Sequence, residues 1–226
     1  MDFSRSFSFM FEDANWFTKI LIGGLWNLAM LLFVLFLFVG IPFILGFLKL
    51  LFIGIPFVLG YFLMVVENVI RDEEQILPDW SGLGTKLQKG LLLCIIYFTY
   101  CLPVILISSL FEESFGESDA LVLVLFMIIL FWLPIVTINY AKTGNFMAAY
   151  HFNDMLNIIM GNTGYYIPMV LLSLAVIGFG FFLGSLLIGI GIPFLSFWAF
   201  IVCAHLFGQF GVYISKGDEG SEKVNV

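Results

Sequence analysis

The sequence predicts an all-α integral membrane protein: a bundle of about six transmembrane helices with two short interfacial amphipathic helices. Three observations lead to this fold class. Hydrophobic residues make up 62% of the 226 residues and charged residues only 11%, whereas soluble domains are about a quarter charged. The apolar residues form runs long enough for the roughly 20-residue helices that cross a bilayer. Only short polar segments separate these runs, so we expect residues 1–226 to form a single membrane domain.

The N-terminal residues predict a short interfacial helix over 3–14. Phe3, Phe7, Met10 and Phe11 recur at helical spacing, and polar residues lie opposite them, as in helices that rest among lipid headgroups. A disordered terminus is the alternative. The stretch lacks the continuous apolar core of a signal peptide, so the first span is expected to direct insertion.

The first long apolar run predicts two spans, at about 17–39 and 43–70, because it is too long for one crossing. Gly40 and Pro42 mark the break between them, since a proline inside a helix removes a backbone donor and clashes with the preceding turn. Lys49, near the start of the second span, can extend its ammonium group to the interface along its own aliphatic stem.

This break belongs to a repeated unit of sequence. Residues 38–47 return almost unchanged as 52–61, which contain Gly54 and Pro56, and a shorter copy begins at Gly191. Two interpretations stay open. The repeat is either a local duplication that gives a kinked, closely packed helix, or a broken helix that lines a binding site, as in transporters.

A charged loop after Ile70 leads to the second half of the chain, in which four more spans are predicted. The acidic turn from Glu112 to Asp119 separates the first two of them. Gly189, Gly191 and Pro193 break the last apolar run. The predicted segments are spans at about 87–110, 120–140, 165–187 and 192–214, an interfacial helix at 145–160 and a polar tail at 215–226.

An even number of spans places both termini on one side of the membrane. Eight of the nine Lys and Arg residues then fall on the side of the termini, and only Lys49 falls opposite. Because basic residues collect on the cytoplasmic side, both termini are predicted to be cytoplasmic. The chain has no basic run, so nucleic acid is not expected as a partner.

Six polar residues in or beside the predicted spans are candidate functional or helix-packing residues, because polar groups at membrane depth are costly and often functional. They are Glu67, Asn139, His151, Asp154, His205 and Gln209. Glu67 is expected to cap its helix or to pair with Arg71, four residues later. Asn139 is expected to form a bond between helices.

The two histidines each have a polar neighbour on the same helix. His205 and Gln209 are one turn apart, and they favour a hydrogen bond that joins helices, with a proton or substrate relay as the alternative. His151 and Asp154 predict the wetted edge of an amphipathic helix, with a metal or proton site as the alternative.

An ordered set of short motifs extends along nearly the whole chain. These are Phe11–Trp16 with Lys19–Gly24, Gly60–Tyr61 with Leu77–Trp80, Tyr140–Asn145, and Phe197–Trp198 with Ala204–Gln209. Their order resembles the uncharacterised prokaryotic polytopic membrane family called domain of unknown function four thousand and thirteen. The extra 14-residue repeat departs from that family's pattern and leaves the course of residues 40–57 open. The resemblance implies a polytopic membrane protein and no reaction, substrate or cofactor.

No motif of a metalloprotease, serine hydrolase or phosphate-binding loop occurs in the sequence. The three cysteines lie within apolar runs without a metal-binding spacing. We therefore expect no catalytic, cofactor or metal site, and no cofactor.

The expected function is that of a non-enzymatic protein of the prokaryotic cytoplasmic membrane, which organises the membrane or assembles a complex. Its expected partners are the lipid bilayer and a membrane protein or a second copy of the chain. A transporter or channel, better suited to a hydrophobic or lipid-like substrate, is the alternative. An intramembrane enzyme using His151, Asp154 and Glu67 is a third hypothesis.

Overall fold

The computed structural model describes residues 1–39, 54–110, 117–187 and 190–222, and these residues contain helices and connecting turns but no strand. The all-α prediction is confirmed. Six of the described helices are long: α2 (Trp16–Val39), α4 (Gly54–Ile70), α5 (Leu83–Leu110), α6 (Glu117–Thr143), α8 (Thr163–Leu186) and α9 (Ile192–Glu222). Four are short: α1 (Arg5–Ser8), η1 (Phe9–Glu12), η3 (Phe146–Tyr150) and α7 (Phe152–Gly161).

Four of the long helices have the length and composition needed to cross a membrane. They are Leu83–Ser108, Ala120–Thr143, Thr163–Leu186 and Ile192–Lys216. α4 is a shorter apolar helix of 17 residues, and α2 has 24 residues. The described part of the chain thus contains four helices that meet the requirements for a span, as in a membrane protein.

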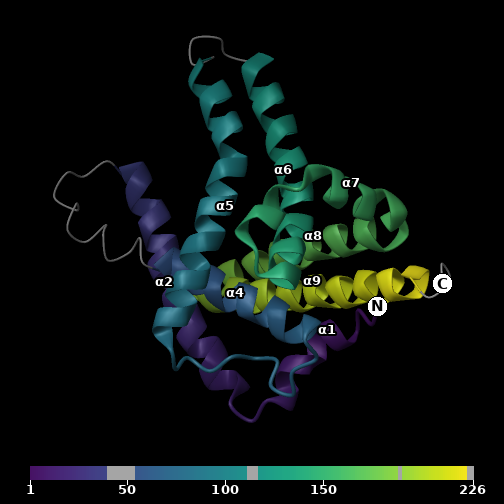
Figure 1. The fold of residues 1–226 in the computed structure, drawn as a ribbon. Helices are drawn as coiled ribbons and strands as arrows, with labels where there is room; N and C mark the ends of the chain where they lie inside the picture. The colour runs from purple at the N-terminus through teal and green to yellow at the C-terminus, as the bar shows by residue number, and fades with distance from the viewer. Residues whose placement is uncertain (40–53, 111–116, 188–189, 223–226) are drawn as a thin grey trace.

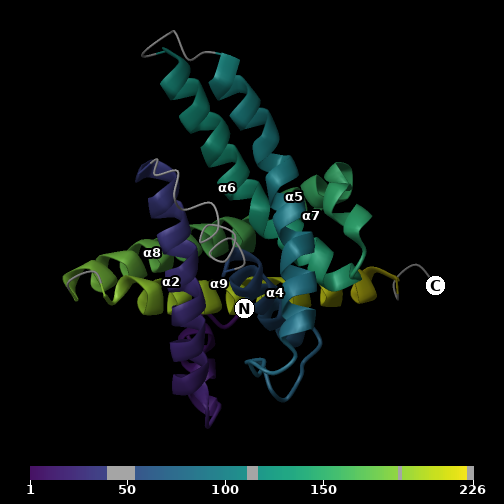
Figure 2. The same ribbon diagram turned by 90° about the vertical axis from the view of Figure 1, so that its left-hand side faces the viewer.

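The long helices do not run parallel to one another. α8 and α9 lie side by side, and α4 packs against α2, α5 and α9. α5 and α6 form a hairpin that rises steeply away from α8 and α9 (Figures 1 and 2). Within the predicted bundle, the described helices form a packed body and a projecting hairpin. Hydropathy along the sequence predicts apolar helices but not the angles at which they cross.

The crossing of α4 and α5 is close because glycines face each other there. A Cβ added at Gly60 would collide with the carbonyl oxygen of Lys86, and one added at Gly90 would collide with that of Pro56. Small residues let helix backbones approach in this way, and dispersion contacts along the crossing then hold the pair together.

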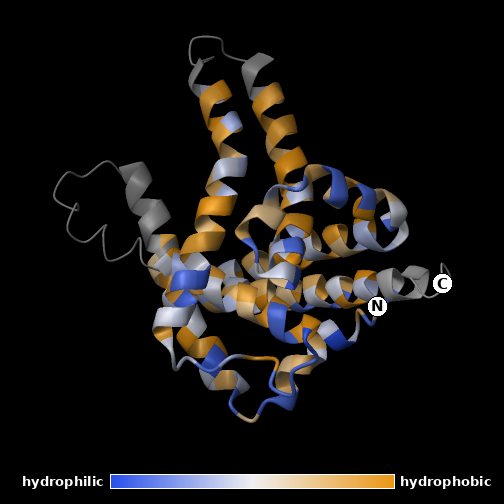
Figure 3. Ribbon diagram, in the orientation of Figure 1, coloured by the Kyte–Doolittle hydropathy of each residue, from blue (hydrophilic) through white to orange (hydrophobic). Residues whose placement is uncertain are grey.

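The projecting part of the hairpin is strongly apolar (Figure 3). On α6, the exposed apolar residues between Leu121 and Ile128 cover most of the helix circumference, while Val122 and Leu125 on the remaining side are only half-exposed. Exposure over most of the helix means that this end of the hairpin packs against little besides its neighbour, α5. Such a surface is stable in lipid and would be costly in water.

Both predicted interfacial helices differ from their expected form. Residues 3–14 fold as α1 and η1, and Phe9 and Met10 are buried. Residues 145–160 divide into η3 and α7 at His151, whose backbone is not helical, and Asn145 caps the start of the 3-10 turn by accepting from the backbone N–H of Met147. α7 then buries Met155 and Ile159 while it exposes other apolar residues.

Candidate functional site

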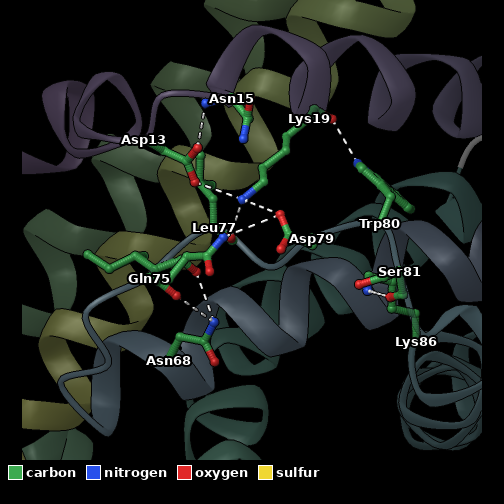
Figure 4. Close-up of polar contacts among 11 residues, drawn as sticks. Asp13, Asn15, Lys19, Asn68, Gln75, Leu77, Asp79, Trp80, Ser81 and Lys86 are labelled. Carbon is green, nitrogen blue, oxygen red and sulfur yellow. Dashed lines mark hydrogen bonds and ion pairs between the residues drawn. The ribbon is translucent and has the colours of Figure 1, made fainter.

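A buried lysine links the start of α2 to the polar loop that follows α4 (Figure 4). The Nζ atom of Lys19 donates to Asp13 Oδ2 at 2.7 Å and to the carbonyl oxygen of Leu77 at 2.8 Å. It also lies 2.8 Å from Asp79 Oδ1. In return, Trp80 Nε1 donates to the carbonyl oxygen of Lys19 at 2.9 Å. We call Asp13, Lys19, Leu77, Asp79 and Trp80 the Lys19 cluster.

The buried charge in the Lys19 cluster is fully paired within the protein, so the cluster serves as a structural link. The side chain of Lys19 is only 4% exposed, and a buried charge is stable only when it is paired and hydrogen-bonded. Its three acceptors supply that pairing. The hydrogen bond from Lys19 holds the pKa of Asp79 below its ordinary value. The three donors of the ammonium are thereby matched by three protein acceptors, so the cluster fixes the loop.

The same loop is held at two further points. Asn68, at the end of α4, donates through Nδ2 to the carbonyl oxygens of Gln75 and Ile76, at 3.2 and 3.0 Å. Lys86, which is buried, donates to the carbonyl oxygen of Ser81 at 2.7 Å, and its Nζ atom lies 6.0 Å from the centre of the Trp80 ring. The polar loop is therefore a fixed part of the structure.

His205 and Gln209 fasten the N-terminal residues to α9. Ser6 Oγ lies 2.9 Å from His205 Nδ1, and the Phe9 ring stacks on the imidazole at 4.1 Å. The Gln209 amide accepts from the backbone N–H of Asp2 at 2.8 Å and donates to its carbonyl oxygen at 2.7 Å. The two side chains contact each other at 3.3 Å, but their wider role is to hold the terminal segment rather than to join two long helices.

Glu67 pairs with a residue other than the one expected. Its carboxylate, only 8% exposed, forms an ion pair with Lys89 of α5, while Arg71 lies exposed after the end of α4. The close crossing of α4 and α5 brings Lys89 within reach. A partner on a neighbouring helix cannot be read from spacing along one helix, so the expected pair with Arg71 was wrong.

The other candidate polar residues lie near η3. Asn139 Nδ2 donates to the carbonyl oxygen of Ala148 at 2.8 Å, so it joins α6 to a 3-10 turn and not to another long helix. His151 Nδ1 lies 3.5 Å from Asp154 Oδ2, and both side chains are more than half exposed. Residues 150–154 line a surface hollow to which Glu67 does not contribute.

The predicted helix breaks mark helix starts where they are described. Gly54 and Pro56 lie in the first turn of α4, where a missing backbone N–H costs little. Gly191 precedes α9, and Pro193 is the second residue of that helix. Three predicted breaks, Gly40, Pro42 and Gly189, lie outside the described residues, as does most of the acidic turn.

An apolar cavity of about 260 Å³ lies where the hairpin meets the body of the molecule. Side chains of α4, α5, α6, α8 and α9 form its wall, and only a few of them are polar. Leu130 and Pro134 come from α6, Leu174 from α8 and Phe200 from α9. A wall of this kind accommodates hydrocarbon.

Several polar residues of these sites were not recognised in the sequence as candidates. They are Ser6, Asp13, Asn27, Asp79 and Lys86. Asn27 of α2 is buried and donates to Ser196 Oγ of α9 at 2.7 Å. A single asparagine within an apolar run was the one available signal for it. The others lie near helix ends or in the loop between α4 and α5, where polar residues are ordinary.

Among the described residues, no group of three His, Cys, Asp or Glu side chains could hold a metal ion. In the comparison with known proteins, residues 44–190 match the family model described as protein of unknown function (DUF4013). This segment includes the motifs at Gly60–Trp80 and Tyr140–Asn145, whereas the motifs before residue 44 and after residue 190 lie outside it. No curated protein and no solved structure matches the chain.

Proposed function

The chain belongs to the DUF4013 family, whose function is unknown, and from this premise we propose that it is a non-enzymatic, multi-span component that organises the membrane or assembles a complex there. The proposed location is the prokaryotic cytoplasmic membrane. Four helices of sufficient length and apolarity support a membrane protein. With α2 and α4 added, the proposed number of spans is six.

The observation that carries the assembly role is the projecting α5/α6 hairpin. Residues with large exposed apolar side chains, such as Ile105 on α5 and Phe126 on α6, cover it. The outer part of the hairpin stands away from α8 and α9 (Figure 2), so transmembrane helices of another protein, or of a second copy, have access to several of its sides. Helix association in lipid depends on such packing contacts.

The contacts of the terminal segments support the proposed orientation, with both termini cytoplasmic. The Lys19 cluster brings the start of α2 to the loop between α4 and α5. The contact of Asp2 with Gln209 places the N-terminal segment beside the later half of α9. Both contacts agree with a topology in which these segments share one side of the membrane, and basic residues there favour the cytoplasm.

The placement of the polar candidates supports a non-enzymatic role. His151 and Asp154 are exposed at the start of α7, while Glu67 is buried in an ion pair between α4 and α5. General acid–base chemistry needs such groups to converge on one reacting atom. The hollow formed by residues 150–154 does not bring these three together.

The apolar cavity favours a second candidate function, a transporter or channel for a hydrophobic or lipid-like substrate. Its wall is built from several helices and contains Tyr97, Ser173 and Cys203 as its few polar side chains. A hydrophilic solute would find few groups to replace its hydration, whereas a hydrocarbon chain would not need them.

Affinity purification from native membranes in mild detergent, with mass spectrometry of proteins and lipids, tests the two functions. Under the assembly role, a stoichiometric protein partner should be recovered, and it should be lost from Ile128→Trp, which enlarges the hairpin surface. Leu171→Trp, at an exposed position of α8, is the control that should retain it. Recovery of the chain alone with a bound lipid would favour transport instead.

A further inference from the structure

We propose that the cavity between the hairpin and the body binds an acyl chain of a membrane phospholipid. The inference deepens the second candidate function and rests on the proposed membrane location. It concerns a site, a ligand class and the residues that admit it. The proposal does not require that the bound lipid be transported.

The polar groups in the cavity wall are bonded within the protein. The Tyr97 hydroxyl pairs with Thr137 Oγ1 at 2.6 Å. Ser173 Oγ donates to the carbonyl oxygen of Met169 at 2.8 Å, and Cys203 Sγ lies 3.5 Å from the carbonyl oxygen of Ser173. With these groups already partnered, the wall selects a ligand segment that is purely hydrocarbon.

The apolar wall of the cavity favours hydrocarbon over water, and its volume has room for a segment of chain. Apolar cavities of roughly 150 Å³ stay dry and bind benzene, and this cavity is larger, at about 260 Å³. Water in it would lack the two to four polar partners that buried water needs. Filling it with a flexible chain would restore the dispersion contacts that its wall otherwise lacks.

Phospholipid is the source because it surrounds the helices that form the wall. Leu174 belongs both to the cavity wall and to the exposed surface of α8, where it is 37% exposed. Cavity and lipid-facing surface therefore meet at this residue. The charged headgroup would stay outside, since the wall offers it no partner.

The test uses the full chain in vesicles of phosphatidylethanolamine and phosphatidylglycerol, some of whose acyl chains end in a photoreactive diazirine. After illumination, mass spectrometry locates the adducts. We expect adducts on the cavity residues Val170 and Phe200, and their loss in Leu174→Trp, whose indole would fill the space. The control Leu171→Trp, at an exposed position outside the cavity wall, should retain them. If Leu174→Trp does not fold, Ile177→Phe replaces it in this test, because it fills the cavity from the next helical turn.

Adducts on the exposed hairpin residues Phe126 and Ile128 report membrane insertion separately. Hairpin adducts without cavity adducts would overturn the lipid site. Cavity adducts that persist when Leu174→Trp fills the cavity would overturn it as well. Absence of hairpin adducts would instead overturn the proposed membrane location. A parallel arm with the diazirine on a free fatty acid separates the two sources: cavity adducts from that arm alone would refute a phospholipid ligand.

Discussion

Lys19 Nζ lies 2.8 Å from Asp79 Oδ1, and through this contact the start of α2 is joined to the loop between α4 and α5. The lysine is almost fully buried, whereas the side chain of Asp79 is 56% exposed. The two partners therefore differ in what their removal should cost.

Lys19→Met should destabilise the protein strongly, because it leaves the carboxylates of Asp13 and Asp79 facing each other without a cation. Removing one member of a buried ion pair costs about 3 to 5 kcal/mol. Asp79→Asn should cost less, within about 1 kcal/mol, since Asp79 is largely exposed. Unfolding followed by circular dichroism in mixed micelles measures both. Equal losses of stability in the two variants would contradict the proposed role of the Lys19 cluster.

Acid should remove the contribution of Asp79. Its pKa is lowered in the folded state, first by the hydrogen bond from Lys19, so its stabilising effect is present above the ordinary value of 3.8 and is lost as the pH falls through the folded value. The difference in melting temperature between the native chain and Asp79→Asn should thus be present at neutral pH and shrink below pH 3.8. A difference in melting temperature that grew as the pH fell would contradict this prediction.

Lys89→Gln should lower stability, because it leaves the buried carboxylate of Glu67 without its cation. Arg71→Gln, which removes the same charge at an exposed position, should have little effect. Thermal unfolding of the two variants in one detergent compares them. If Arg71→Gln proved the more damaging change, the ion pair between α4 and α5 would be refuted.

Ser6→Ala should loosen the N-terminal segment by removing the partner of His205. One hydrogen bond of this kind contributes about 1 kcal/mol. Ser8→Ala, at an exposed position of α1, is the matched control. Limited proteolysis after Arg5 should be faster for Ser6→Ala and unchanged for Ser8→Ala. Identical cleavage rates would show that the segment is not held through His205.

Gly90→Ala should force α4 and α5 apart, because the added methyl group would collide with the carbonyl oxygen of Pro56. Overpacking of this kind costs about 1 to 3 kcal/mol. A Cβ at Gly178, inside α8, meets nothing within 4 Å, so Gly178→Ala should be neutral or stabilise by up to about 1 kcal/mol. Unfolding midpoints of the two variants test this ordering, and a neutral Gly90→Ala would refute the close crossing.

The helices were largely predictable from the sequence because membrane-length apolar runs carry a strong local signal. The predicted spans 87–110 and 120–140 fall within α5 and α6. Side-chain partners were less predictable, since Glu67 reaches Lys89 on another helix. For His205, the sequence offered Gln209 one turn away, but Ser6 comes from the opposite end of the chain.

The steep rise of the hairpin from the body was not predicted from the sequence. Apolar residues surround α6 on every side, so no single face indicates where it packs. The cavity follows from that arrangement, so it could not be predicted from the sequence either. Its wall combines side chains from five helices, none of which is distinctive by itself.

Photo-crosslinking from the hairpin in living cells tests the proposed assembly role most directly. A photoreactive phenylalanine analogue would replace Leu123, Phe126 or Ile128, all exposed on α6, with the exposed Phe152 of α7 as the control position. The assembly role predicts one discrete protein adduct from the hairpin positions and none from position 152. Adducts with lipid alone at all three hairpin positions would contradict it.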